Sequence, residues 1–279
     1  MKHAITLAVA GALLSTLAAA QDPRQAPKTA GIESKGYEWA KMEGEMKEAL
    51  AVKGNAKKGE EGYEVCGACH LPSGAGRPDG TFPQLAGQHT TVLIKQMADI
   101  RMGLRDNPTM YPFAKELHDP TELAHVSAYI QSLCIPVDHG KYEGKDAAVQ
   151  IANGKTLYEK QCLECHGKNG DGQKDKFYPV IAGQHYAYLL RQMTEIRDGK
   201  RRNANPDMVK VIKPYTNEQL VAISAYQSSL VMPGAMWFPG AQLNYVQHLF
   251  SHADASHAAG HPAIVFSDEA LLARGELRE

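Results

Sequence analysis

The segment Cys66-Gly67-Ala68-Cys69-His70 guides the interpretation of this 279-residue chain, because its pattern, C-x-x-C-H, returns as Cys162-Leu163-Glu164-Cys165-His166. The two copies stand 96 residues apart, and residues that follow them repeat with the same offset. Residues 83–107 thus share Ala-Gly-Gln-His and several further positions with residues 179–203. A period this long is typical of tandem duplication, since solenoid repeats run about 20–50 residues. The sequence therefore predicts two homologous domains of about 90 residues each.

The repeated pattern is that of covalent c-type haem attachment. Two thiols about one helical turn apart add to the two vinyl groups at one porphyrin edge, and the next residue turns its imidazole toward the iron. A dithiol redox motif needs no adjacent histidine, and the halves of a zinc site would lie some 90 residues apart, far beyond the usual spacing. We therefore predict covalent haem at Cys66, Cys69, Cys162 and Cys165, with His70 and His166 as iron ligands.

Each iron also needs a sixth ligand, and a methionine thioether raises the reduction potential of a His-ligated haem. Met110 and Met208 follow their histidines by 40 and 42 residues, in segments rich in Asn and Pro. A methionine in a loop between two helices can lie over a haem face, so we predict these two as the distal ligands. Met97 and Met193 fall within amphipathic helices and are expected to pack in the core.

Several polar residues that recur in both copies have more than one interpretation. His89 and His185 are rival iron ligands, although a surface or helix-capping histidine is the more common case. The carbonyls of Pro83 and Pro179 are expected to accept the Nδ1–H of the haem-ligating imidazoles. The recurring arginines either pair with haem propionates or lie at solvated helix ends; they are Arg101, Arg105, Arg197 and Arg201.

The remainder of each copy predicts helices joined by loops, without convincing strand alternation, and the expected fold class is all-α. The helices are expected at residues 55–65, 88–101 and 119–133 in the first copy, and at 148–161, 184–197 and 217–230 in the second. Asp119 or Thr121 is expected to cap the third of these, and Asn217 the last. Tyr129 and Tyr226 are expected to pack a helix against each haem edge.

These motifs resemble those of the two-haem class I cytochromes c of the c-four type, over about residues 55–232. The resemblance implies two small helical haem domains in tandem, each ligated by His and Met. It also implies electron transfer in the periplasm, usually toward a terminal oxidase or another reductase. It assigns haem attachment to the four motif cysteines, with His70 and His166 as proximal and Met110 and Met208 as distal ligands.

The ends of the chain depart from that family. Residues 1–20 have a charged start, a short apolar run and a small-residue cleavage site, as in a signal peptide for export. The predicted divisions are a signal peptide at 1–20, an extension at 21–54, cytochrome c domains at 55–137 and 138–232, and a tail at 233–279. Within the extension, residues 35–50 predict an amphipathic helix. The tail resembles the start of acetoacetate–CoA ligase but lacks that enzyme's phosphate loop, which suggests a fusion or a truncation.

A net charge of −1, from 30 basic and 31 acidic residues, argues against nucleic-acid binding. The sequence predicts an electron carrier whose partners are redox proteins such as a reductase, an oxidase or a dehydrogenase, and it leaves peripheral membrane association open. Two alternatives are an electron-transfer subunit of a larger dehydrogenase or oxidase, and a two-haem enzyme of the peroxidase or thiosulfate dehydrogenase type. The enzyme would need an open iron position or a cysteine ligand, and the spare thiol, Cys134, is expected to be buried.

Overall fold

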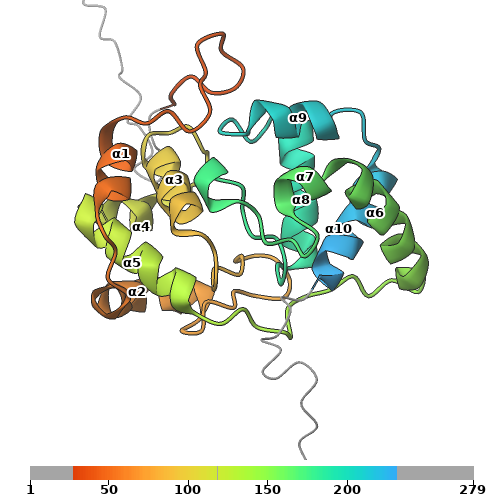
Figure 1. The fold of residues 1–279 in the computed structure, drawn as a ribbon, viewed down its shortest axis with the longest axis horizontal. Coiled ribbons are helices and arrows are strands. Elements are labelled where there is room, and N and C mark those ends of the chain that lie inside the picture. The colour runs from red at the N-terminus through yellow and green to blue at the C-terminus, as the bar shows by residue number, and fades with distance from the viewer. Residues whose placement is uncertain (1–27, 118, 231–279) are drawn as a thin grey trace, which may run out of the picture. The chain divides into compact units, whose positions relative to one another are not determined.

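The computed structural model describes residues 28–117 and 119–230, all of which belong to one compact unit of the chain (Figure 1). The predicted signal peptide and the tail lie outside the described residues. Helices and loops make up the described part, where the one β-pairing is an isolated bridge between Gln173 and Tyr178. The all-α prediction is therefore confirmed. No helix among the described residues combines the length and apolar character that a membrane span requires.

The first repeat begins where Asn55 caps α2 by accepting a hydrogen bond from the backbone of Lys58. Its helices are α2 (Ala56–His70), α3 (Thr90–Arg101), α4 (Tyr111–Glu116) and α5 (Pro120–Ser132). Asp119 caps α5 through the N–H of Thr121, and proline occupies the first helical position, where its missing N–H costs nothing. The C-x-x-C-H segment thus forms the last turns of an uninterrupted helix.

The second repeat follows the same order with small departures. Its elements are α6 (Ala147–Gln161), α7 (Leu163–His166), a 3-10 turn at Lys174–Lys176, α8 (Tyr186–Arg197), α9 (Pro206–Ile212) and α10 (Asn217–Ser229). Here Cys162 joins α6 to a separate short helix, α7, which holds the rest of the motif. The cap of α10 is Thr216, one residue before the predicted Asn217, because Thr216 and Gln219 form a reciprocal capping box.

In each repeat the helix that leads into the motif packs closely against the last helix, α2 on α5 and α6 on α10. Glycine permits the contact: a Cβ on Gly59 would lie 1.9 Å from the carbonyl oxygen of His125, and one on Gly154 would lie 1.9 Å from that of Ala222. These contacts fix the direction in which each motif enters its site.

Tyrosine pairs reinforce both crossings. The rings of Tyr63 and Tyr129 lie 5.3 Å apart, and those of Tyr158 and Tyr226 lie 5.2 Å apart. Tyr129 and Tyr226 therefore pack helix against helix, and neither lines the cavity described below, contrary to the prediction that they would meet a haem edge.

The N-terminal extension forms a shorter helix than predicted. Residues 35–43 form turns and irregular backbone, with a positive φ at Ala40, and α1 spans only Gly44–Ala51. Figure 1 shows α1 beside α3 and α5. Met46 and Ala49 of α1 are buried in the core of the first repeat. Ahead of α1 the chain crosses to the second repeat, where the N–H of Ile32 donates to the carbonyl of Arg202 over 2.8 Å. The extension therefore contacts both repeats.

Candidate functional site

A cavity of about 780 Å³ joins the predicted haem-binding residues of both repeats. The first repeat contributes Cys66, Cys69, His70 and Met110, and the second contributes Cys162, Cys165, His166 and Met208. Much of the remaining wall is aliphatic, from residues of α3, α8 and the loops before them. All eight predicted site residues thus meet one largely apolar space.

The imidazoles of His70 and His166 are fixed by the loops that follow them. Nδ1 of His70 lies 2.8 Å from the carbonyl oxygen of Pro83, and Nδ1 of His166 lies 3.4 Å from that of Pro179. Because a carbonyl can only accept, Nδ1 carries the proton and Nε2 keeps its lone pair for a metal. Burial lowers the pKa of both histidines, which favours the neutral, ligating form. The predicted contacts of these imidazoles with the two proline carbonyls are confirmed.

The motif cysteines are free thiols in the structure rather than disulfides. Burial raises the pKa of Cys66 to about 11 and that of Cys162 to about 12, so both are protonated near neutral pH. Raised thiol pKa values are the opposite of what a reactive redox dithiol requires. Among residues 28–117 and 119–230 no group of three or more His, Cys, Asp or Glu side chains could hold a metal ion.

Met110 and Met208 both line the cavity; Met110 lies in a turn, as predicted, whereas Met208 lies in a helix rather than in a loop. Met110 is the residue before α4, and its N–H donates to Oδ1 of Asn107 over 3.1 Å. Met208 lies in the first turn of α9, with its N–H 3.3 Å from Oδ1 of Asn205. Both thioethers therefore come from backbone that an asparagine side chain fixes.

Met97 and Met193 also line the cavity, and both pack in the core as expected. Met193 is buried in the core of the second repeat, and Met97 packs against two clusters of the first. Met102, which has no counterpart in the second copy, is exposed.

The four recurring arginines divide into two structural pairs. Arg101 forms an ion pair with Glu45 of α1 and donates to the carbonyls of Ala114 and Leu117, which anchors α4. Arg197 pairs with Asp198 at the end of α8. Neither lines the cavity, whereas Arg105 and Arg201 do.

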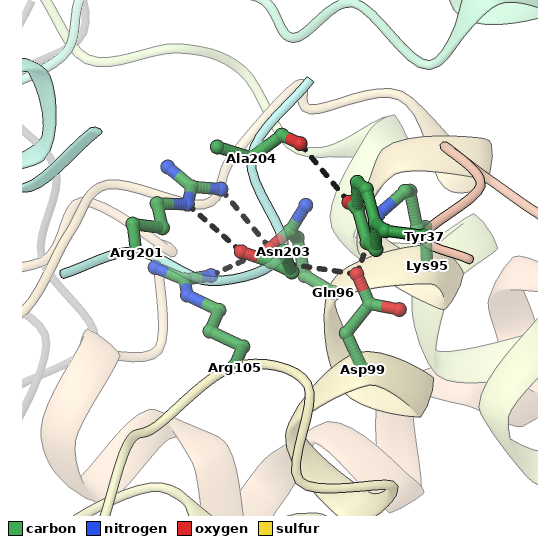
Figure 2. Close-up of polar contacts among 8 residues, drawn as sticks. All are labelled: Tyr37, Lys95, Gln96, Asp99, Arg105, Arg201, Asn203 and Ala204. Atoms are coloured by element: carbon green, nitrogen blue, oxygen red, sulfur yellow. Dashed lines mark hydrogen bonds and ion pairs between the residues drawn. The ribbon is translucent and has the colours of Figure 1, made fainter. Parts of the chain in front are cut away.

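Arg105 and Arg201 form a polar cluster between the repeats (Figure 2). Arg105 donates to Oε1 of Gln96 over 2.9 Å, and Arg201 donates to the same oxygen over 3.1 Å. Nδ2 of Asn203 also donates to Gln96, and it reaches Oδ2 of Asp99 over 2.7 Å. The cluster thus links α3 of the first repeat to the loop before α9 of the second.

The positive charges of this cluster exceed the negative charge that contacts them directly. Asp99 already pairs with the buried Lys95. Burial and the nearby Arg105 lower the pKa of Arg201 to about 10. Two guanidinium groups in a cavity wall, sharing neutral acceptors, are a site that attracts anions. The carboxylates of a haem are chemically suited to it.

His89 and His185 do not line the cavity and bind backbone across the domain interface instead. Nε2 of His89 lies 2.8 Å from the carbonyl oxygen of Asp171, and Nε2 of His185 lies 2.8 Å from that of Ala75. His185 is the N-cap residue of α8 and only 1% exposed, so of the two expected cases, a surface or a helix-capping histidine, it fits the cap position and not the surface. Its Nδ1 is occupied as well, because it accepts from the N–H of Gly140.

The sequence predicted no role for the preceding residues, Gln88 and Gln184, although both belong to the repeated Ala-Gly-Gln-His segment. Gln88 accepts from the N–H of Val180 and donates to its carbonyl, both over 2.9 Å. Gln184 likewise accepts from the N–H of Gln84 over 3.0 Å and donates to its carbonyl over 2.9 Å. The repeats are therefore docked through reciprocal contacts.

Cys134 differs from its prediction. The thiol is exposed rather than buried, and it does not line the cavity. It is therefore not placed to ligate a haem within that space.

The cavity fits haem c in three respects: paired thiols beside an apolar space, neutral imidazoles with a free Nε2, and cations available for carboxylates. Among the described residues, no hydrogen bond involves Nε2 of His70 or His166. Thioether links to both cysteines of a pair would tether a porphyrin that a domain this small encloses only partly.

Comparisons with known proteins agree with this geometry. The cytochrome c family model matches residues 56–134 and 151–230. Cytochrome c4 of Azotobacter vinelandii is 32% identical over 189 residues, which are 63% of this chain and 90% of that protein. The thiosulfate dehydrogenase electron acceptor of Stutzerimonas stutzeri (strain A1501) is 31% identical, over 58% of this chain and 77% of its own.

A solved structure supports the same relationship. Reduced recombinant cytochrome c4 from Pseudomonas stutzeri matches with a TM-score of 0.56 at 29% identity, over 64% of this chain and 100% of that chain. The chain therefore belongs to the cytochrome c family and, within it, to the two-haem cytochromes c4, electron-transfer proteins with two covalently bound haem c groups.

Proposed function

We propose that this chain passes single electrons between redox proteins through two haems, each held by its own repeat. The first haem is assigned to Cys66 and Cys69 with His70 and Met110 as axial ligands, and the second to Cys162 and Cys165 with His166 and Met208. The observation that carries this proposal is that these eight side chains line one cavity. When bound, haem iron supplies one-electron chemistry by cycling between its ferric and ferrous states.

The protein's contribution is to set the potentials and to hold the cofactors. The proline carbonyls keep the proximal imidazoles neutral and oriented, and the thioethers of Met110 and Met208 favour the reduced iron. Arg105 and Arg201 would neutralise haem carboxylates inside the cavity. With a histidine and a methionine from the protein ligating each haem, neither iron would be open to a substrate, so we propose a carrier rather than an enzyme.

An oxidoreductase is the favoured class of electron donor, since one relative is named for accepting electrons from thiosulfate dehydrogenase. A thiosulfate-oxidising role for this chain itself is less favoured, because Cys134 lies outside the cavity. The signal-like residues 1–20 favour the periplasm as its location.

Substitution of the two methionines tests the ligand assignment. Met110→Ala and Met208→Ala should each lower one of two reduction potentials, because loss of the thioether removes its preference for ferrous iron. Each should also halve the weak red charge-transfer band of the oxidised protein while both haems stay attached. Met102→Ala, at an exposed site, is the control and should leave both potentials in place. Unchanged potentials in both variants would reject the assignment.

A further inference from the structure

We propose that the glutamine of each Ala-Gly-Gln-His segment is a positioning residue for the iron of the opposite repeat: Gln184 acts on His70, and Gln88 acts on His166. The inference rests on the haem ligation proposed above. Each proximal histidine is thereby influenced by one residue from the other repeat.

The argument begins with one peptide group in the first repeat. The carbonyl of Pro83 and the N–H of Gln84 belong to the same planar, conjugated amide. The carbonyl accepts from Nδ1 of His70 over 2.8 Å, while the N–H donates to Oε1 of Gln184 over 3.0 Å. The side chain of Gln184 is thus joined to the proximal imidazole through a single amide.

The second repeat contains the same arrangement with the roles of the two repeats exchanged. The carbonyl of Pro179 and the N–H of Val180 share a peptide group. That carbonyl lies 3.4 Å from Nδ1 of His166, and the N–H donates to Oε1 of Gln88 over 2.9 Å. The final link is longer here than in the first repeat, so the glutamine should have less influence on His166 than on His70.

Each glutamine is also held by a contact within its own repeat. Oε1 of Gln184 also accepts from the N–H of His185, and Oε1 of Gln88 from that of His89, each over 3.1 Å. Gln84, Gln88 and Gln184 are all buried. Hydrogen bonds excluded from water are stronger, and in a chain they polarise one another.

Polarisation of the shared amide affects the iron. An acceptor at Gln84 N–H makes the Pro83 carbonyl a better acceptor, which draws on the His70 proton and makes the imidazole a stronger electron donor. A stronger donor stabilises ferric iron, so Gln184 lowers the potential of the haem on the first repeat. Gln88 does the same for the second.

The test uses the full-length holoprotein with ¹⁵N-labelled histidine, carrying Gln184→Met or Gln88→Met. In the reduced protein, the Nδ1–H resonance of each proximal histidine is followed by NMR and assigned through the aromatic ring beside it. Phe82 lies 6.0 Å from the His70 ring, and Tyr178 lies 6.4 Å from the His166 ring. Gln184→Met should shift the His70 proton upfield and raise the potential of that haem. Gln88→Met should shift the Nδ1–H resonance of His166 in the same direction by a smaller amount.

Thr91→Val is the matched control, because it removes an uncharged hydrogen bond across the same interface, from Thr91 to the carbonyl of Lys174. It should leave the Nδ1–H resonances of both proximal histidines unchanged. Gln184→Asn, which withdraws the amide by one methylene, replaces Gln184→Met if that variant does not accumulate. Three results would overturn the proposal in protein whose haem signals are intact. They are a change only at the histidine of the variant's own repeat, equal changes at both proximal histidines, and no change in either Nδ1–H resonance. Absence of a haem-ligated histidine would overturn the proposed function as well.

Discussion

His185 uses both ring nitrogens in the domain interface, which requires the neutral imidazole. Burial lowers its pKa below the ordinary value, so the folded chain resists the proton that the unfolded chain accepts. The contribution to stability is therefore complete above about pH 6.5 and is lost as the pH falls below it, by about 1.4 kcal/mol per pH unit for one proton. Glutamine could make both contacts without titrating.

We accordingly expect His185→Gln to flatten the acid side of the stability profile. The free energy of unfolding, measured by denaturant titration at pH 7.5 and 5.5, should fall more in the parent protein than in the variant. Equal losses would show that His185 contributes nothing to the pH dependence.

At this scale the sequence predicted contacts within a repeat better than contacts between repeats. The bond from His70 to Pro83 was predictable because both residues belong to one copy and recur together. The partners of Gln184 and His185 lie 100 and 110 residues away, and only the docking of the two copies brings them close. The repeated Ala-Gly-Gln-His segment indicated a shared role in both copies, but the sequence did not show which residues of the other repeat it contacts.

The crossing of α6 and α10 depends on the absence of a side chain at Gly154. Gly154→Ala would place a methyl group 1.9 Å from a carbonyl oxygen and force the helices apart. Overpacking costs about 1–3 kcal/mol, and a clash with backbone belongs to the upper part of that range, above the roughly 1 kcal/mol gained in helix propensity. We expect a lower free energy of unfolding for the whole protein, measured by thermal denaturation.

Gly36→Ala provides the comparison, since no heavy atom lies within 4 Å of the added Cβ. Its stability should stay within about 0.5 kcal/mol of the parent. If the two alanine variants were equally stable, the close helix crossing would be refuted.

Among the secondary-structure elements, the helix predicted at residues 35–50 differs most from the structure. The apolar spacing predicted a helix there, but Tyr37 and Trp39 are used in tertiary contacts ahead of α1. The hydroxyl of Tyr37 donates to the carbonyl of Ala204 over 3.0 Å, and the ring of Trp39 lies 3.9 Å from Nζ of Lys95. Periodicity cannot distinguish apolar residues that face one helix side from those that bind across an interface.

The docking of the two repeats involves the extension as well as the repeated motifs. Residues 28–43 contact the first repeat through the N–H of Thr29, which donates to the carbonyl of Gly103, and the second through Ile32 and Tyr37. A variant lacking residues 28–43 should keep both repeats folded but lose this connection. Calorimetry should then resolve two unfolding transitions where the parent shows one. A single transition in both proteins would mean that the extension does not couple the repeats.

For the whole molecule, the central claim is that each C-x-x-C-H segment holds one haem covalently. Mass spectrometry of proteolytic peptides, from protein produced in a host that attaches haem c, tests this most directly. We predict one haem on the peptide with Cys66 and Cys69 and one on the peptide with Cys162 and Cys165. A disulfide, a free cysteine pair or a missing haem on either peptide would contradict the account.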